Sequence, residues 1–335
     1  MIEALCIERF RGIKKSCIAG FKQVTILSGG NGVGKSTLLE AIYASSAPLR
    51  SQDELRGIDK LDYLILRRGG RGSWKDSRNV IWYNMDISQP ITITLQVKGT
   101  RYDFLLTNES LTSSPIYAWV NTNEGLINFE AGKMLLRGSG EEVVAKRQPD
   151  PVLASMFSSV LLLDQYTLRE PSIIEELCWS KLIASRLDKK IIMFLRSGLI
   201  RDAEGLTYAP VGGGNTLFLQ TSKTSIRLED AGEGVRNGVL LAMVVLALRP
   251  QLILLDDPEV GMDSAALYTF TKLLLETIRT TGSQVFIATR SMELVEMGEA
   301  LSSEIGGEIS TIFLEKMQDG VLAARTSPQE ATGIV

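Results

Sequence analysis

The sequence of 335 residues contains no histidine. Nucleophilic triads that depend on histidine, histidine-ligated metal sites and nucleases of the HNH type are therefore excluded within this chain. Any chemistry that the chain performs must use carboxylates, lysine, arginine, backbone amides or a hard metal ion such as Mg²⁺.

Cysteine is scarce, with only Cys6, Cys17 and Cys178 in the chain. Their spacing matches no zinc-binding motif, and we expect them to form no disulfide framework. The first twelve residues lack the charged and then apolar layout of a signal peptide. These features predict a protein of the reducing cytoplasm.

Long apolar runs and a strong net charge are also absent. The longest apolar run, residues 239–248, has ten residues, about half of a membrane span, so we expect no transmembrane helix and no membrane partner. The net charge is −3, so nucleic acid would have to bind a local basic patch. With 44% apolar and 22% charged residues, the composition is that of a globular protein, and we expect residues 1–335 to form a single domain.

Fully apolar strands alternate with helical patterns along most of the chain, which predicts an α/β fold with a parallel sheet core. Paired strands at the start predict N-terminal β-hairpins. Residues 50–150 differ in character, and we interpret them as a β-rich insertion. The expected strands are 4–9, 14–19, 24–28, 91–97, 102–106, 160–163, 216–220, 225–228, 252–255, 284–289, 310–316 and 320–325, and the expected helices start at 36, 239 and 264.

A glycine-rich loop between the strand at 24–28 and the following helix matches the pattern GxxxxGK[ST]. Glycines allow successive backbone N–H groups to surround a phosphate, and the helix adds its positive end. Lys35 would neutralise the β- and γ-phosphates, and Ser36 would bind Mg²⁺. The predicted ATP-binding residues are Gly30, Asn31, Gly32, Val33, Gly34, Lys35, Ser36 and Thr37.

Two aspartates follow the apolar strand at 252–255 and would complete such a site. Asp256 is expected to hold Mg²⁺ through water, and Asp257 stands where a base that activates water is expected. A strand that ends in two solvated carboxylates before a turn is the alternative explanation. The four consecutive aliphatic residues before the acids favour the nucleotide site.

With both motifs in place, the chain resembles the ABC-type ATPase heads of the SMC/RecF class. It is most similar to the stand-alone or OLD-like AAA ATPases that accompany nucleases in DNA repair and anti-phage defence. The resemblance covers roughly residues 1–48 and 155–320. It depends on Ile7–Ile13 with the P-loop, on Leu228–Asn237 as a degenerate signature motif, and on Asp257–Asp263.

The resemblance implies that two heads bind ATP between them, with the P-loop of one head facing the signature motif of the other. Gly232 and Gly234 would then offer backbone amides to a γ-phosphate across a two-fold interface. A glycine-rich turn that caps the next helix is the alternative reading. The resemblance also places Arg11 near the base or ribose, and Arg290 at the position of a switch histidine.

Several positions depart from the family pattern. Asp230 and Ala231 replace a serine and a glycine of the signature, and Asp257 is one methylene shorter than the usual glutamate. Arg290 cannot carry a proton, although it can stabilise phosphate charge. Losing a general base costs about 10²–10⁴ in rate, so we predict slow ATP hydrolysis. Glu259 is a substitute carboxylate, and Gln165 is the candidate for the Q-loop glutamine.

A basic segment at residues 67–78 holds five arginines and lysines and one tryptophan. Cations with an aromatic ring suit sequence-independent DNA binding. A solvated loop, or a docking surface for an acidic partner, explains the segment equally well. Double-stranded DNA is thus one candidate partner.

The leading hypothesis is an ATPase that binds ATP and Mg²⁺. It would form a dimer or a higher even-numbered homo-oligomer. Its nucleotide state would be signalled to DNA or to a separate effector protein, such as a nuclease. We expect no nuclease domain after residue 325, so an effector nuclease would be a separate polypeptide. One alternative is an ATP-gated scaffold with negligible turnover. Another is the ATP-binding subunit of a transporter, against which the poor signature motif argues.

Overall fold

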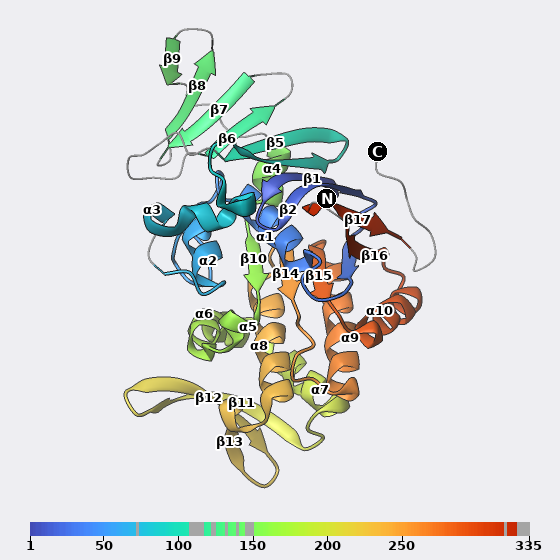
Figure 1. Ribbon diagram of the computed structural model, residues 1–335. Helices are drawn as coiled ribbons and strands as arrows, with labels where there is room; N and C mark the ends of the chain where they lie inside the picture. The colour runs from blue at the N-terminus through green and yellow to red at the C-terminus, as the bar shows by residue number, and fades with distance from the viewer. Residues whose placement is uncertain are drawn as a thin grey trace.

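The computed structural model describes residues 1–71, 74–106, 117–121, 125–130, 133–138, 141–144, 151–317 and 320–326. Within these residues, two sheets enclose the first long helix, and further helices cover the outer face of one sheet (Figure 1). The predicted α/β class, with N-terminal β-hairpins and a parallel sheet core, is confirmed.

The central sheet has the strand order β10-β14-β15-β3-β16-β17. The first five strands are parallel, and β17 pairs antiparallel with β16. Every residue of β3, β10 and β15 is buried, as expected for parallel strands that are covered on both faces. The strands are β3 (Val24–Ser28), β10 (Val160–Leu163), β14 (Leu252–Asp256), β15 (Gln284–Thr289), β16 (Ile309–Lys316) and β17 (Leu322–Arg325).

The second sheet is antiparallel and begins with the N-terminal hairpin, in the order β2-β1-β4-β5-β6-β7-β8-β9. Strand β4 pairs with β1, so the strands after the P-loop helix extend the sheet that the N-terminus starts. The strands are β1 (Ile2–Phe10), β2 (Ile13–Ala19), β4 (Ile91–Val97), β5 (Thr100–Leu106), β6 (Tyr117–Asn121), β7 (Gly125–Glu130), β8 (Lys133–Gly138) and β9 (Glu141–Val144).

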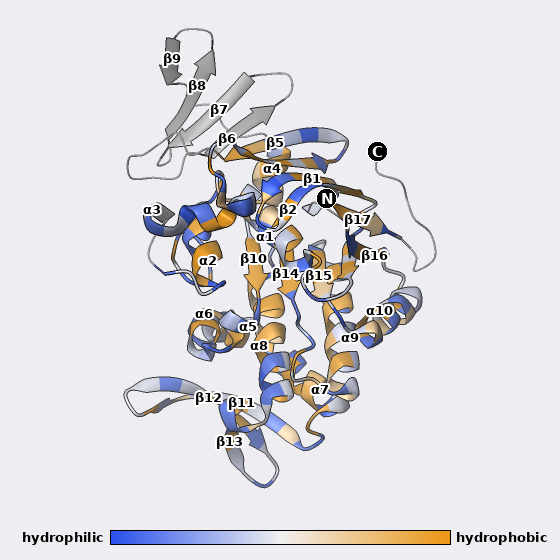
Figure 2. Cartoon of the chain, in the orientation of Figure 1, coloured by the Kyte–Doolittle hydropathy of each residue, from blue (hydrophilic) through white to orange (hydrophobic). Residues whose placement is uncertain are grey.

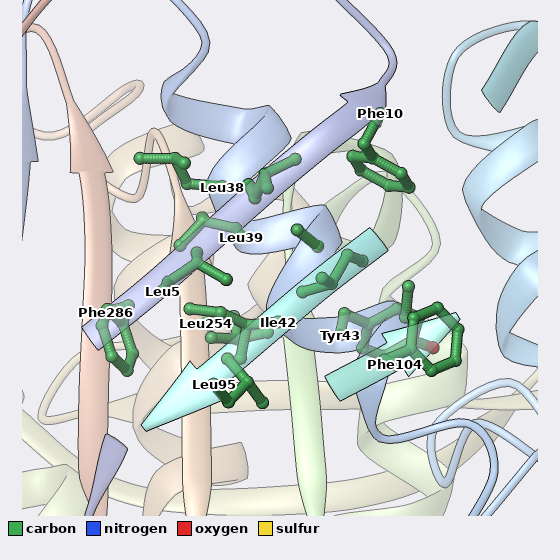
Figure 3. Packing of buried hydrophobic residues seen from close by; sticks show 14 of the residues in the cluster. Leu5, Phe10, Leu38, Leu39, Ile42, Tyr43, Leu95, Phe104, Leu254 and Phe286 are labelled. Atoms are coloured by element: carbon green, nitrogen blue, oxygen red, sulfur yellow. The ribbon is translucent and has the colours of Figure 1, made fainter. Parts of the chain in front are cut away.

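Helix α1 (Lys35–Ser45) lies between the two sheets and is buried along nearly its whole length. Figure 3 shows Leu39 and Ile42 of α1 packed among Leu5 and Leu95 of the antiparallel sheet and Leu254 of the parallel sheet. Fully burying one such side chain contributes about 1.5–3 kcal/mol to folding. This apolar layer therefore holds the start of α1 at a fixed position beside the ends of β3 and β14.

Five longer helices pack in the second apolar cluster of the molecule, which also includes side chains of the parallel strands. Figure 2 shows that β10 and β14, which lie between the two layers, are strongly hydrophobic. The helices are α6 (Pro171–Ala184), α7 (Asp188–Gly198), α8 (Glu233–Leu248), α9 (Ser264–Thr281) and α10 (Met292–Ile305), and the shorter ones are α4 (Pro151–Met156), α5 (Gln165–Leu168) and η3 (Leu228–Asp230).

A separate three-stranded sheet lies away from α1 at the opposite end of the molecule (Figure 1). The hairpin expected at 216–220 and 225–228 is present as β12 (Gly214–Thr221) and β13 (Ser225–Arg227). Strand β11 (Ala203–Val211), which the sequence pattern did not predict, pairs with β12. Gly212 and Gly213, with φ of +57° and +93°, form the turn between β11 and β12.

The segment expected to be β-rich contains strands β4 to β9, whereas its first part is helical. Asp59 accepts a hydrogen bond from the Leu61 amide at 2.8 Å and caps the first helix. Apolar side chains of this helix are buried against α1, so long-range packing stabilises a short element with no clear amphipathic period. The elements before β4 are α2 (Lys60–Leu66), α3 (Trp74–Ser77), η1 (Arg78–Ile81) and η2 (Tyr83–Met85).

The expectation that no disulfide forms is wrong for one pair of cysteines. Cys6 of β1 and Cys17 of β2 are directly opposite each other in the antiparallel register and form a disulfide. Cys178 is free and buried in α6. The two partner cysteines are eleven positions apart, and only the hairpin register brings them together.

Among the described helices, none combines the length and the apolar composition that crossing a lipid bilayer requires.

Candidate ATP and magnesium site

The P-loop connects β3 to α1 and depends on glycine at defined positions. Gly34 precedes α1 with φ of +113°, a conformation that L side chains rarely adopt. Gly29 has φ of +151°, and a Cβ atom there would lie 2.6 Å from the Leu314 carbonyl oxygen. Only with glycine at these two positions can the backbone follow the tight path that phosphate binding requires.

The lysine of the P-loop lies along the loop itself. Lys35 Nζ donates hydrogen bonds to the carbonyl oxygens of Gly29 at 2.7 Å and Gly30 at 2.9 Å. Burial lowers the pKa of Lys35, while the carboxylates of Asp257 and Asp256 oppose this shift. The ammonium group is thus next to the space where the phosphates of a nucleotide would bind.

The two motifs that the sequence placed 220 residues apart meet in one hydrogen bond. Ser36 Oγ at the start of α1 donates to Asp256 Oδ1 at the end of β14, at 2.8 Å. Strand β14 is separated from β3 by β15, and α1 packs over these strands, so the sheet order produces this contact. The contact places together the two predicted magnesium ligands.

Asp257 follows β14 in a left-handed backbone conformation, with φ of +49°. Its amide donates to the Ala288 carbonyl at 2.9 Å, which anchors the residue to β15. Its Oδ1 atom is buried without a hydrogen-bond partner among the described residues and lies 3.9 Å from Nε of Arg290. Burial and the neighbouring Asp256 raise the pKa of Asp257, whereas Arg290 and Lys35 oppose the shift.

A second carboxylate of the same turn, Glu259, is held by Thr289 of β15. The Thr289 hydroxyl donates to Glu259 Oε1, while Oε2 is buried with no hydrogen-bond partner in the described part of the chain. Burial raises the pKa of Glu259, and the Thr289 hydrogen bond lowers it in part. The substitute base considered from the sequence is therefore already engaged through one of its oxygens.

Gln165 lies beside the acidic end of β14, where its Nε2 donates to the Asp257 carbonyl oxygen at 3.1 Å. From the sequence, only its position after the strand at 160–163 was known, and that strand, β10, pairs directly with β14 in the sheet. Arg290, directly after β15, has a side chain that is 54% exposed. The structure thus brings both residues to the Asp257 side of the site.

On the other side of the P-loop lies a cavity of about 470 Å³, large enough for part of a nucleotide. Its lining includes Arg11, as the sequence analysis expected, but the Arg11 guanidinium is bound within the protein. Nε donates to Glu40 at 2.8 Å and Nη2 donates to the Leu64 carbonyl at 2.5 Å. The remaining lining residues are Gly12, Gly32, Val33, Gly34, Lys35, Ser36, Thr37, Arg68, Val80, Trp82, Asn84 and Met85.

The signature segment forms the start of α8, next to β13 and away from α1 in Figure 1. Gly232 precedes the helix with φ of +91°, and the space around it is open. Gly234 has a different constraint, because a Cβ atom there would overlap the Gly261 carbonyl oxygen. Asp230 is turned toward Arg227, with oxygens 2.8 and 3.0 Å from its guanidinium nitrogens.

The interpretation of the basic segment as a free DNA-binding loop is wrong for its first residue. The Arg67 side chain is 5% exposed and contacts three carboxylates, those of Glu40, Asp164 and Asp256. Arg68 is 44% exposed and is paired with the buried Glu40. Residues 72 and 73, and the side chains of residues 74 and 75, lie outside the described part of the chain.

Sequence reasoning missed Glu40, the buried carboxylate at the centre of this cluster. It lies on α1, five residues after Lys35, and its side chain is fully buried. Burial alone would raise its pKa, but Arg11, Arg67 and Arg68 hold the pKa of Glu40 below its usual value. The only signal in the sequence is a glutamate among the apolar residues of the helix that follows the P-loop. Such a carboxylate needs cationic partners once the helix is buried.

The residues present fit Mg²⁺ together with a nucleotide. Magnesium sites of ATPases use one or two protein oxygens and complete the shell with phosphates and water. Ser36 and Asp256 supply such oxygens, and the cavity at the P-loop leaves space for the phosphates. In the described residues, no group of three or more Asp, Glu, Cys or His side chains is arranged to hold a metal.

Comparison with known sequences finds one matching family model and two similar proteins. Residues 149–296 match the family model described as "AAA domain, putative AbiEii toxin, Type IV TA system". The "ATP/GTP phosphatase" of Helicobacter pylori is 21% identical, covering 97% of this chain and 95% of that protein. An uncharacterized protein of Methanocaldococcus jannaschii is 23% identical over 29% of this chain and 84% of its own length.

Solved structures share the fold at low identity. The Smc head domain of Pyrococcus furiosus, bound to the C-terminal domain of ScpA, has a TM-score of 0.52 at 15% identity, and the match covers 97% of this chain and 96% of that one. A second Smc head, bound to the C-terminal winged-helix domain of ScpA, also has a TM-score of 0.52, at 14% identity, covering 97% and 98%. Residues 149–296 are therefore similar to an AAA domain, and the chain has the fold of Smc head domains.

Proposed function

We propose that the protein binds ATP with Mg²⁺ and hydrolyses it slowly. The observation that carries this proposal is the hydrogen bond between Ser36 and Asp256, because it joins the P-loop to the acidic strand end as a magnesium-dependent nucleotide site requires. When bound, Mg²⁺ would neutralise phosphate charge. Lys35 would leave the loop carbonyls for the β- and γ-phosphates, and Asp257 would accept a proton from the attacking water.

Slow turnover follows from the local geometry of Asp257. Its side chain is short, and its raised pKa makes it a better proton acceptor once ionised, but its Oδ1 already faces Arg290 at 3.9 Å. The Arg290 guanidinium would stabilise charge on the γ-phosphate without transferring a proton. A general base with restricted reach gives a lower rate than the family's usual glutamate.

We further propose that two copies pair around ATP. Gly232 lies at the exposed start of α8, and its open surroundings leave room for an incoming phosphate. Asp230, whose charge would repel a phosphate, is neutralised by Arg227 instead of facing this space. These features support the signature reading of residues 228–237, with Gly232 and Gly234 as donors to the nucleotide of the other copy.

The proposed partners are a second copy of the chain and a separate effector protein. Two structures with the same fold are heads bound to ScpA, which supports a protein partner for this head. An effector nuclease in DNA repair or anti-phage defence, and double-stranded DNA, remain parts of this proposal. We place the protein in the cytoplasm, where the Cys6–Cys17 disulfide would be reduced and the β1–β2 backbone pairing would hold the hairpin instead.

The test is steady-state ATP hydrolysis by the purified protein, with and without double-stranded DNA, against Lys35→Ala. We expect slow release of phosphate that Lys35→Ala abolishes, and stimulation by DNA if DNA is a ligand. Turnover that persists in Lys35→Ala would exclude this site as its source.

A second candidate function is an ATP-gated scaffold with negligible turnover. The contact between Asp257 and Arg290 favours it, since a carboxylate paired with arginine is less able to accept a proton. In that case the protein would bind ATP and assemble, and phosphate release would stay at background whatever partner is added.

A further inference from the structure

The guanidinium of Arg67 lies between four elements of the fold. Arg67 directly follows α2, and its three partners belong to α1, to the turn after β10 and to the end of β14. Nη1 is 2.6 Å from Glu40 Oε1, Nε is 2.6 Å from Asp164 Oδ2, and Nη2 is 2.6 Å from Asp256 Oδ2. Each nitrogen of one planar group thus serves a different carboxylate.

The two oxygens of Asp256 have different partners. Oδ1 accepts the Ser36 hydroxyl at 2.8 Å, and Oδ2 accepts Arg67 Nη2 at 2.6 Å. Rotation of the carboxylate would break both contacts at once. The side chain of Arg67 is 5% exposed and that of Asp256 is 11% exposed, so water cannot readily replace either contact.

We propose that Arg67 is a positioning residue for the magnesium site, which orients Asp256 so that Oδ1 faces Ser36. The inference rests on the proposed ATP and Mg²⁺ binding. Residues that orient a metal ligand through hydrogen bonds typically change metal affinity by about 10–100-fold when they are replaced. Arg67 does this from the position directly after α2, a helix that precedes β14 by more than 180 residues.

The planar shape of the group is central to this role. A guanidinium presents donors in fixed directions, so it can hold three carboxylates in a defined mutual arrangement. A lysine ammonium retains the charge but is a compact group on a flexible stem. Arg67→Lys therefore keeps the cation among the three acids while loosening the orientation of Asp256.

Arg68 provides a matched control. It follows Arg67 directly, and its Nε is 2.7 Å from the same Glu40 oxygen, Oε1. None of the hydrogen bonds found for Arg68 in the described residues reaches Asp256 or Asp164. Arg68→Lys thus perturbs the shared buried carboxylate without perturbing the magnesium ligand.

The experiment measures the affinity of a fluorescent ATP analogue with excess Mg²⁺ and again with EDTA, for the wild type, Arg67→Lys and Arg68→Lys. Thermal melting shows that each variant is folded. We expect Arg67→Lys to bind the analogue in EDTA as the wild type does, but to lose about tenfold or more of the gain in affinity that Mg²⁺ provides. Arg68 also lines the cavity at the P-loop, so Arg68→Lys can change the affinity in Mg²⁺ and in EDTA alike, but it should retain the full gain that Mg²⁺ provides.

A Mg²⁺ gain that is unchanged in Arg67→Lys would overturn the inference and leave the proposed function standing. Equal weakening in Mg²⁺ and in EDTA would also overturn it, because that pattern indicates a structural role alone. If Arg67→Lys fails to fold, Arg67→Gln is measured in its place, and failure of both variants to fold would assign Arg67 to stability only. A wild type that binds no analogue would overturn the proposed function itself.

Discussion

Three carboxylates occur within four residues after the buried part of β14, and each has different surroundings. Asp256 is held by Ser36 and Arg67, Glu259 accepts a hydrogen bond from Thr289, and Asp257 retains a buried oxygen without a hydrogen-bond partner in the described part of the chain. A carboxylate that acts as a base must have an oxygen available to water. Asp257 and Glu259 each keep one such oxygen among the described residues, but the other oxygen of Glu259 is bound by Thr289, so Asp257 stays the predicted base.

We predict that Asp257→Asn lowers the turnover of ATP by about 10²–10⁴, the usual effect of losing a general base. Asp257→Glu should retain turnover, because it restores the longer reach. Glu259→Gln serves as the matched control and should lower turnover far less. The reverse order, with Glu259→Gln inactive and Asp257→Asn active, would identify Glu259 as the base.

The same residue gives a prediction about pH. Asp257 accepts a proton only when it is ionised, and burial and Asp256 raise its pKa above the ordinary value of about 3.9. Turnover should therefore fall as the pH drops through this raised pKa. A profile of kcat against pH measures the midpoint, which should lie above that of a free aspartate and disappear in Asp257→Asn. A midpoint at or below the ordinary value would contradict the raised pKa.

At the scale of elements, α6 carries a buried carboxylate that has no cation among its described contacts. Glu175 is 2% exposed, Oε2 accepts the Leu217 amide of β12 at 3.2 Å, and Oε1 has no hydrogen-bond partner among the described residues. Burial raises the pKa of Glu175 to about 7, with smaller contributions from Glu229 and Glu176. The contact joins α6 to the three-stranded sheet, so the charge state of one residue affects how these two elements pack.

We predict that Glu175→Gln changes the free energy of unfolding, relative to the wild type, more favourably at pH 8 than at pH 5. Between its unfolded pKa of about 4.5 and its folded pKa of about 7, the folded state binds more protons, so wild-type stability falls as the pH rises through this range. Glutamine does not titrate, and the variant should gain on the order of 2 kcal/mol relative to the wild type between these pH values. Urea unfolding at both pH values measures this, and parallel pH dependence in the two proteins would contradict it.

At the scale of the whole molecule, the two parts of the proposed interface lie in different regions of one chain. The P-loop precedes α1 between the sheets, whereas Gly232 lies at the start of α8, next to β13 (Figure 1). Gly234 and Gly261 pack closely and connect the start of α8 to the turn that follows β14. A second copy is therefore needed if both motifs are to contact one nucleotide.

We predict that Asp257→Asn, which slows hydrolysis, forms dimers in the presence of ATP and Mg²⁺. Adding Gly232→Asp should abolish these dimers, because a carboxylate would repel the γ-phosphate. Gly213→Asp is the matched control, since Gly213 has a similar φ of +93° and equally open surroundings in the β11–β12 turn. Sedimentation velocity measures the species. Loss of dimers in both variants would indicate backbone strain instead of interface loss.

Local spacing in the sequence determined the P-loop, the acidic end of β14 and the alternation of apolar strands with helices, because each depends on residues that are near neighbours in the chain. The parallel sheet, though not the order of its strands, was predicted from the alternation of helices with fully apolar strands. These features fix the fold class and most of the proposed nucleotide contacts.

Only the tertiary structure decided which distant side chains meet. Arg67 and Asp256 are 189 residues apart, and their contact depends on how α2 packs beside the end of β14. The pairing of Cys6 with Cys17 depends on hairpin register, and the position of Gln165 on the order of strands in the sheet. A sequence pattern shows which residues are charged or apolar, but the contacts of a buried charge are set by the packing of the elements that carry its partners.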